Sequence, residues 1–294
     1  MKSNVLLFDR PSSLQAAAPP EDRAEDRDGV RLLVTTPAAN IHAQFTDLHE
    51  FLAPGDLLVV NESATVPASL PAEGPIGSFI LNLSSRFGNG LWVAEPRWSA
   101  LKPGPLPLEE GQRLVIPGLD ARLISRYPGL DRLWFVRLDG DVAAALENHG
   151  SPIRYGYVDQ DFSLDAYQTI FARVPGSAEM PSAARPFTQA VVDKLRAKGV
   201  EIAAILLHTG VSSLEVTSEE LEDQVMYPEP FEISGATAQA VNDAKKEGWN
   251  IIAVGTTVVR ALESAWDGEQ YTPPRASPGF ISTRAGRSTW WMAC

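Results

Sequence analysis

The sequence predicts the α/β fold class, with a parallel or mixed sheet domain and an inserted small all-β barrel domain. Two patterns in the 294 residues predict it. After residue 141, apolar runs of strand length alternate with amphipathic helical segments, which is typical of a sheet covered by helices. Between residues 66 and 140, short alternating runs follow one another with Gly and Pro turns between them. We therefore expect a discontinuous α/β catalytic domain, residues 1–65 and 141–294, interrupted by a β-barrel domain, residues 66–140.

The segment before the barrel predicts one buried strand. Residues 16–28 are rich in Ala, Pro and charge, and they indicate an irregular lead-in to the apolar residues 32–34. A Pro-Gly-Asp turn signal then precedes a short apolar strand, residues 57–60, which ends at Asn61.

The barrel prediction depends on the spacing of its strands. Polar and apolar residues alternate over five short runs, which are residues 79–83, 91–95, 113–116, 121–125 and 133–138. Gly-Pro, Pro-Gly and Gly-Asn-Gly turns separate the runs. This near-regular spacing is typical of a small barrel or sandwich.

Capping residues delimit the helices that follow the barrel. Asp141, Thr188 and Ser234 each precede a helical pattern and can accept hydrogen bonds from its first N–H groups. Helices are expected over residues 141–148, 188–199 and 234–248, and from 256 to about 266. Apolar strands are expected at residues 202–207 and 251–254, and the strand–helix–strand order predicts that these two are parallel neighbours.

Composition and charge restrict the class of protein. Lys and Arg number 25 against 37 Asp and Glu, so the formal net charge is −12, which disfavours non-specific binding to nucleic acid. No apolar run approaches the roughly 18 residues of a membrane span. The apolar residues 5–8 are too few for a secretory signal, and the single Cys294 allows no intrachain disulfide. We expect a cytoplasmic protein.

Several motifs that carry chemistry are missing from the sequence. Neither the Gly-x-Gly-x-x-Gly pattern nor a P-loop occurs, which disfavours nucleoside triphosphate chemistry. A Gly-x-Ser-x-Gly elbow is also missing, which removes the commonest signal of a serine hydrolase. His42, His49, His149 and His208 are far apart and the only Cys is terminal, so we expect no metal.

Polar residues follow three of the predicted strands. They are Asn61-Glu62-Ser63, His208-Thr209-Gly210 and Gly255-Thr256-Thr257. Because parallel strands end at a common edge, and open α/β sheets bind ligands there, we expect the active site at this edge. The alternative is that these Gly and Thr residues only end strands and cap helices.

Two of the candidate residues have two interpretations each. Thr256, Arg260 and Glu263 share a face of the last helix, where Thr256 and Arg260 can present donors to an anion. A surface ion pair between Arg260 and Glu263 explains the same spacing. His208 is either a structural residue at a strand end or a proton-transfer group.

Five blocks of the sequence carry a resemblance to a known family. They are Leu57-Leu58-Val59-Val60-Asn61, Tyr167-Gln168-Thr169, Pro175-Gly176-Ser177, Leu207-His208 with Gly210, and Gly255-Thr256-Thr257-Val258-Val259-Arg260-Ala261-Leu262-Glu263-Ser264. On these blocks the sequence resembles the S-adenosylmethionine:tRNA ribosyltransferase-isomerase family of the queuosine pathway. The resemblance runs from about Arg31 to Ala265, and it implies an α/β domain with an inserted β-barrel.

The resemblance implies a reaction and a set of site residues. The ribosyl part of S-adenosylmethionine, the co-substrate, is transferred and rearranged onto the aminomethyl group of a 7-deazaguanine base in tRNA, and adenine and methionine are released. By this resemblance His208 handles protons, Arg260 or Arg185 holds the carboxylate of methionine, and Glu229 or Glu263 faces the cation or a ribose hydroxyl. The implied catalytic residues are His208, Glu229 and Arg185, and the implied substrate-binding residues are Asn61, Ser63, Tyr167, Gln168, Thr169, Ser182, Gly210, Gly255, Thr256, Thr257, Arg260 and Glu263.

The sequence departs from the family pattern at charged and proton-transfer positions. Family histidines or arginines are replaced at Pro186, Gln224, Tyr227, Ala64 and Ser69, and Ser212-Ser213-Leu214-Glu215 stands in place of a Gly-Thr-Phe-Arg segment. The tail from residue 268 has no counterpart of the family's C-terminal block, and it is either loosely ordered, truncated or divergent. The lost Arg residues and the net charge of −12 weaken the tRNA partner. Two alternatives therefore stay open, a small-molecule acceptor with the same donor and a catalytically silent nucleoside-binding homologue.

Overall fold

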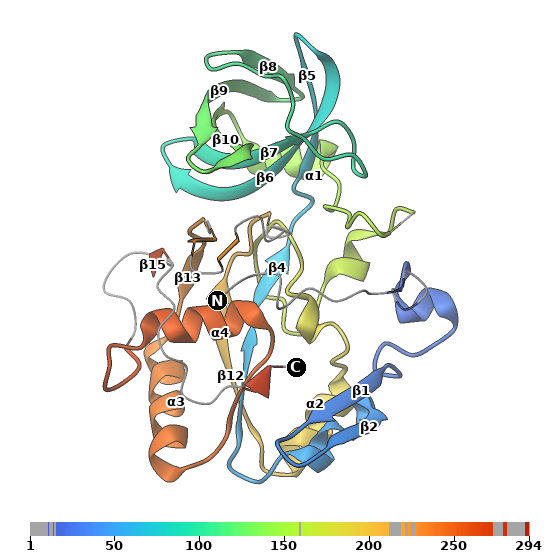
Figure 1. The fold of residues 1–294 in the computed structure, drawn as a ribbon, viewed down its shortest axis with the longest axis vertical. Coiled ribbons are helices and arrows are strands. Elements are labelled where there is room, and N and C mark those ends of the chain that lie inside the picture. The colour runs from blue at the N-terminus through green and yellow to red at the C-terminus, as the bar shows by residue number, and fades with distance from the viewer. Residues whose placement is uncertain are drawn as a thin grey trace.

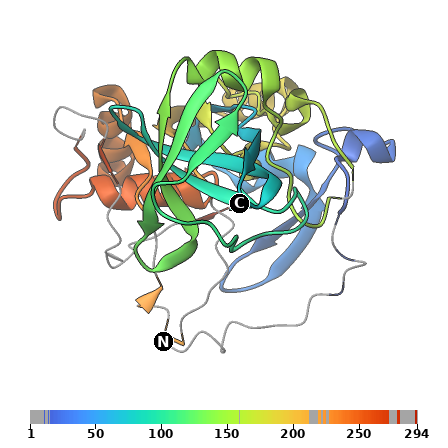
Figure 2. The same cartoon turned by 90° about the horizontal axis from the view of Figure 1, so that it is seen from above.

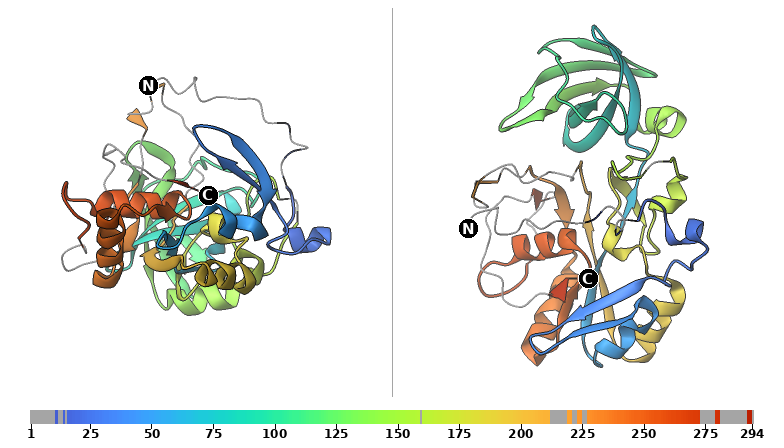
Figure 3. Two further views of the ribbon diagram at one scale, coloured as in Figure 1. Left: turned by 90° about the horizontal axis from the view of Figure 1, so that it is seen from below. Right: turned by 45° about the vertical axis from the view of Figure 1, so that its right-hand side comes forward.

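In the computed structural model the chain forms two lobes, a β-barrel and a larger α/β body (Figure 1, Figure 3). The structure describes residues 11, 14, 16–158, 160–211, 219–220, 223–224, 227–272, 279–280 and 292–293. The chain leaves the body for the barrel after β4 (Ser63–Thr65) and returns through α1 (Val142–His149).

The body contains a six-stranded mixed sheet. In spatial order its strands are β15 (Gly279–Phe280), β13 (Pro230–Glu232), β12 (Glu201–Leu207), β3 (Leu57–Asn61), β14 (Ile251–Ala253) and β16 (Met292–Ala293). The central strand β3 runs parallel to both β12 and β14, whereas β13 is antiparallel to both of its neighbours. The mixed sheet confirms the α/β part of the predicted fold class.

The two strands expected to be parallel neighbours, β12 and β14, are parallel but not adjacent. β3 lies between them and pairs with both. The prediction of adjacency is wrong because strand order is a tertiary property. The chain that connects β12 to β14 crosses over β3, a strand that precedes the barrel in the sequence and lies between them in the sheet.

Helices form at the predicted positions, and a predicted cap residue precedes the first three. The helices are α1, α2 (Gln189–Ala197), α3 (Gly235–Glu247) and α4 (Thr256–Ala265). The side chains of Asp141, Thr188 and Ser234 each accept a hydrogen bond from an N–H group of the first turn of α1, α2 and α3. These bonds satisfy donors that the helix itself cannot pair.

Helices cover both faces of the sheet. On β3, Leu57 and Val59 pack toward α3 and α4, whereas Leu58 and Val60 pack toward α2 and the 3-10 helix η4 (Phe45–Phe51). All four side chains are at most 2% exposed. A strand buried on both faces is apolar throughout, which explains the continuous apolar run in the sequence.

The inserted lobe is a closed six-stranded barrel. In spatial order its strands are β10 (Leu130–Asp139), β7 (Leu91–Arg97), β6 (Gly77–Gly88), β5 (Ser69–Gly74), β8 (Arg113–Ile116) and β9 (Leu119–Tyr127). Leu81, Leu123 and Trp134 fill its interior and are at most 1% exposed. The barrel confirms the second part of the predicted fold class. The sequence analysis did not identify β5, because Pro71 interrupts its pattern.

All the barrel strands fall within the expected interval, residues 66–140. The helix α1, which was expected in the body, packs instead under the barrel, where Leu146 belongs to the barrel's buried cluster and Val142 packs against it. The division of the chain into two domains stays a prediction. The packing of α1 favours a barrel unit that extends through His149.

The remaining elements lie around the body. The lead-in contains the short 3-10 helix η3 (Pro20–Arg23), and a hairpin of β1 (Arg31–Thr35) and β2 (Asn40–Gln44) follows. Seen from above, this hairpin lies on the side of the molecule opposite to α3 and α4 (Figure 2). Most of the tail after residue 272 lies outside the described residues. No described helix is long and apolar enough to cross a membrane.

Asp56, at 2% exposure, joins two loops beneath the sheet. Its carboxylate accepts hydrogen bonds from the N–H of Ala53 at 2.8 Å, and from the N–H and side-chain amide of Asn250 at 3.0 Å each. We expect Asp56→Ala to lower the free energy of unfolding by about 2 kcal/mol, since three charge-assisted bonds are lost. Chemical denaturation measures this change. The exposed Asp120→Ala is the control, and an equal loss in both variants would contradict the prediction.

Candidate active site

The sheet opens at Asn61, where β3 and β12 stop pairing. Asn61 is the last residue of β3 in register with β12, opposite Ile205. Beyond it the Asn61 side chain replaces the backbone, because its Nδ2 donates to the carbonyl of Leu207 at 2.8 Å and its Oδ1 accepts from the Leu207 N–H at 3.0 Å. The same Oδ1 accepts from the N–H of Ser63 at 3.1 Å. This amide, at 0% exposure, lets the strands separate with their polar groups paired.

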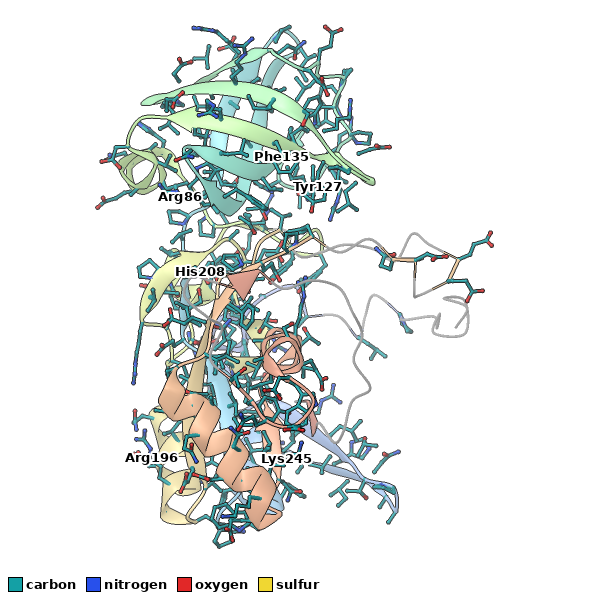
Figure 4. The ribbon with its side chains drawn as sticks, turned by 90° about the vertical axis from the view of Figure 1, so that its left-hand side faces the viewer. Arg86, Tyr127, Phe135, Arg196, His208 and Lys245 are labelled. Carbon is teal, nitrogen blue, oxygen red and sulfur yellow. The ribbon has the colours of Figure 1, made fainter. Side chains whose placement is uncertain are left out.

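His208 lies in the opened edge, at the end of the body that faces the barrel (Figure 4). Its Nδ1 is 2.8 Å from the Oγ of Ser63, which is 2.7 Å from the Oγ of Ser177. Ser177 Oγ also accepts a hydrogen bond from the N–H of Thr209 at 3.0 Å. Because a hydroxyl can donate and accept at once, the two serines and the imidazole form a hydrogen-bonded chain. Both serines are at most 1% exposed.

The surroundings of His208 favour the neutral form of its imidazole. Burial lowers its pKa below the usual value near 6.5. The strand β11 (Val174–Ser177) lies directly against the ring, because a Cβ built on Gly176 would lie 2.5 to 2.7 Å from three ring atoms. Gly176 is therefore required by the close approach of the ring.

A second buried cluster forms around Glu229. Its Oε1 accepts from the N–H of Gly210 at 2.6 Å, and its Oε2 accepts from Arg260 Nη1 at 2.5 Å. Arg260 Nη2 donates to the carbonyl of Tyr227 at 2.8 Å. Burial raises the pKa of Glu229, and the opposing effects of Arg260 and Gly210 do not cancel the rise. The guanidinium of Arg260 thus joins α4 to the segment before β13, an arrangement that neither interpretation of Arg260 included.

The barrel reaches this cluster through β6. Ser84 Oγ accepts from the N–H of Val211 at 3.0 Å and donates to Tyr227 Oη at 3.3 Å. A Cβ on Gly210 would overlap both of these oxygens. Gly210 therefore allows the barrel to contact the site closely.

Arg185 lies with Tyr167 and Ser182 at a different pocket, of about 220 Å³. Its guanidinium forms a two-pronged ion pair with Glu21, with Nη1 to Oε2 at 3.0 Å and Nη2 to Oε1 at 3.3 Å, and its Nε donates to the carbonyl of Ala166. Burial raises the pKa of Glu21, but hydrogen bonds from Arg27, the backbone and Arg185 outweigh it and lower this pKa to about 2. The structure therefore brings Arg185 together with Glu21 rather than with His208.

Gln168 and Thr169 form hydrogen bonds that stabilise the backbone next to the site. The amide of Gln168 donates to the carbonyl of Thr65 at 2.8 Å and accepts from its N–H at 3.0 Å, while Thr65 Oγ1 donates to the carbonyl of Tyr167. Thr169 Oγ1 accepts from the N–H of Phe171 at 3.3 Å. These bonds fix β4, which carries Ser63.

The start of α4 holds the last group of candidates. Gly255 is its N-cap, with φ 91°, and its backbone approaches Ala183 closely. Thr256 is exposed, whereas Thr257 and Glu263 are half-buried. Thr256 and Arg260 do not act on a common group in this structure, because Arg260 binds Glu229.

Among the contact residues of the site, Ser177, Gly176 and Glu21 were not predicted from the sequence. Ser177 and Gly176 stand in one of the quoted blocks, so a signal existed, but neither was chosen as a candidate. Glu21 lies in the irregular lead-in and gives no signal. No group of three or more His, Cys, Asp or Glu able to hold a metal occurs in the part of the chain that is described, and the expectation of no metal stays a prediction. Residues 212–215, among the departures, lie outside the described residues.

Comparisons with known proteins point to one family. A family model described as queuosine biosynthesis protein matches residues 4–285. The S-adenosylmethionine:tRNA ribosyltransferase-isomerase of an Anaeromyxobacter species is 37% identical over 301 residues, covering 99% of this chain and 82% of that protein. The protein of the same name from Thermus thermophilus is 39% identical over 260 residues, covering 84% and 74%. A crystal structure of S-adenosylmethionine tRNA ribosyltransferase from Thermotoga maritima is 27% identical, covers 90% of this chain and 74% of that one, and has a TM-score of 0.40.

We expect Gly176→Ala to displace the His208 ring and break its bond to Ser63, because the added methyl has no room. The overpacking lowers the free energy of unfolding by about 1 to 3 kcal/mol. NMR titration of the imidazole measures the altered environment. Gly235→Ala, where a Cβ meets nothing within 4 Å, is the control. An unchanged His208 titration in Gly176→Ala would show that the ring does not depend on this contact.

Proposed function

The chain belongs to the queuosine biosynthesis protein family, and on this premise we propose that it is an S-adenosylmethionine:tRNA ribosyltransferase-isomerase. The ribosyl part of S-adenosylmethionine is transferred to, and rearranged on, a 7-aminomethyl-7-deazaguanine base in tRNA, and adenine and methionine leave. The observation that carries the proposal is the Ser177–Ser63–His208 chain at the ligand-binding edge of the sheet. The shared name of the relatives favours this function over a small-molecule acceptor and over a silent homologue.

The reaction needs a base, and His208 has the properties of one. The sulfonium of S-adenosylmethionine acidifies the hydrogens on C5′, so a base that removes one leaves a carbanion next to the positive sulfur. A neutral imidazole can accept that proton, and burial favours the neutral form of His208 by lowering its pKa. The Oγ of Ser63 fixes the plane of the ring, and Ser177 in turn fixes Ser63.

Glu229 is proposed to balance positive charge at the same edge. The N–H of Gly210 and the guanidinium of Arg260 hold its carboxylate in place. A carboxylate held in this way stabilises a nearby sulfonium or accepts from a ribose hydroxyl without reorganising. The remaining edge residues, Asn61, Gly255, Thr256, Thr257 and Glu263, stay proposals for substrate contacts.

Of the two arginines, Arg185 is better suited to bind the methionine carboxylate of the donor. Arg260 is paired with Glu229, whose side chain is 3% exposed and hard to displace. Arg185 is paired with Glu21, whose side chain is 39% exposed and stands in the short 3-10 helix η3. A carboxylate already binds Arg185 through two oxygens, so a substrate carboxylate can exchange with it.

We expect His208→Ala to reduce adenine release from S-adenosylmethionine in the presence of tRNA by about 10² to 10⁴-fold, with donor binding retained. Chromatography of released adenine and calorimetric titration measure the two quantities. Because burial lowers the pKa of His208, the wild-type rate is expected to fall as the pH decreases through this lowered pKa, at a lower pH than for an exposed histidine. His42→Ala, on exposed β2, is the control. Intact turnover by His208→Ala would remove His208 from the mechanism.

Opposite effects on donor affinity are expected from the two partners of the Arg185 ion pair. Arg185→Gln weakens binding of S-adenosylmethionine about tenfold, because a carboxylate contact is lost, whereas Glu21→Gln strengthens it several-fold, because the competitor is removed. Calorimetric titration measures both dissociation constants. Glu25→Gln, on the same segment, is the control. Weaker binding in Glu21→Gln would mean that Glu21 orients Arg185 rather than competing for it.

A further inference from the structure

A cavity of about 650 Å³ lies between the barrel and the body. The barrel contributes Arg97 at the end of β7 and Arg132 near the start of β10, and the body contributes Arg154, Tyr155 and Glu179. This volume is in the range of pockets that hold small molecules the size of a nucleotide. Tyr155 also lines the smaller pocket at Arg185, so the two cavities adjoin.

Two of the three arginines in this cavity have a buried donor without a partner. Arg97 and Arg132 share one carboxylate, Glu95, at 3.3 and 3.1 Å, and Arg154 is paired with Asp161, whose side chain is 93% exposed. The Nε atoms of Arg97 and Arg154 are buried and have no hydrogen-bond partner. An unpaired buried N–H costs free energy, and a ligand oxygen can remove that cost. A planar guanidinium can donate hydrogen bonds to two oxygens of one phosphate, and it therefore binds phosphate particularly well.

The same cavity presents a buried carboxylate and an aromatic ring. Glu179 is 5% exposed. Tyr155 is stacked parallel to Tyr157, with ring centroids 5.5 Å apart and an interplanar angle of 2°. A ligand that fits these groups carries an anion, a flat ring and a cation. A nucleotide whose base bears an aminomethyl group has all three.

The cavity borders the edge that holds His208. The N–H of Ala178, the residue before Glu179, donates to the carbonyl of Thr209 at 2.7 Å. Ile153 of the cavity wall packs in one buried cluster with Ala178 and Val211. Donor and acceptor must meet for the ribosyl group to transfer, and this arrangement places the cavity beside the proposed donor site.

We propose that this cavity binds the acceptor nucleotide of the RNA, with Arg97, Arg132 and Arg154 on the phosphate and Glu179 on the protonated aminomethyl group of the base. The inference deepens the proposed function and rests on it. Phosphate contacts give affinity without sequence preference, whereas the contact from Glu179 identifies the modified base.

The test compares two labelled anticodon stem–loop RNAs, one with guanine and one with 7-aminomethyl-7-deazaguanine, by fluorescence anisotropy without S-adenosylmethionine. Arg154→Gln should weaken binding of both RNAs about fivefold and reduce the slope of log affinity against log salt by about one. Glu179→Gln should weaken binding of the aminomethyl RNA alone. Arg154→Lys should retain most of the salt slope. Arg137→Gln, an exposed barrel residue with the same charge change, is the control.

RNA binding is measured without S-adenosylmethionine, so it does not depend on ribosyl transfer. The proposed function and the assignment of the cavity can therefore be disproved independently. The assignment of the cavity would be overturned if Arg154→Gln and Arg137→Gln bound RNA with equal affinity. It would also be overturned if Glu179→Gln lost the same affinity for both RNAs. Either result would count even if adenine is released. Adenine that is never released, with the expected RNA affinities intact, would overturn the proposed function and leave the cavity as an RNA-binding site. Melting temperatures of the variants exclude unfolding as the cause.

Discussion

The separation of two parallel strands at Asn61 is the constraint on which the rest of the site depends. Strands that stayed paired would close the edge of the sheet, and strands that parted without compensation would leave buried polar groups unpaired. The Asn61 amide supplies both bonds that Leu207 would otherwise lose. The chain can then turn into β4, which pairs with β11 and so brings Ser63 to Ser177 and to His208.

The arginines near the site form ion pairs with carboxylates, some of which are buried and others exposed to solvent. Glu95 and Glu229 are buried partners, whereas Glu21 and Asp161 are accessible to water. When a ligand displaces a buried carboxylate from its arginine, the carboxylate is left as a buried charge without a counter-ion or water. An exposed carboxylate that is displaced is solvated by water instead. In a chain of net charge −12, Arg185 and Arg154 are therefore the arginines of this group from which an anion most easily displaces the existing carboxylate.

The local features of the fold could be predicted from sequence better than the tertiary ones. Asp141, Thr188 and Ser234 signal helix starts through their own side chains, so those starts were found. The position of β3 between β12 and β14 depends on packing between distant segments, and no local pattern reports it. At the site, His208 and Glu229 could be named, but the carboxylate that binds Arg185 could not, because Glu21 lies 164 residues away in a segment that carries no site motif.

The central place of β3 has a consequence for how the chain assembles during synthesis. β3 is made before the barrel, whereas both strands that flank it, β12 and β14, are made after the barrel. The barrel strands follow one another within residues 69–139, so their contacts are short in sequence and can form early. During this time the apolar strand β3 has left the ribosome, but the strands that pair with it have not yet been synthesised. During this interval the nascent chain is most exposed to aggregation and to chaperones.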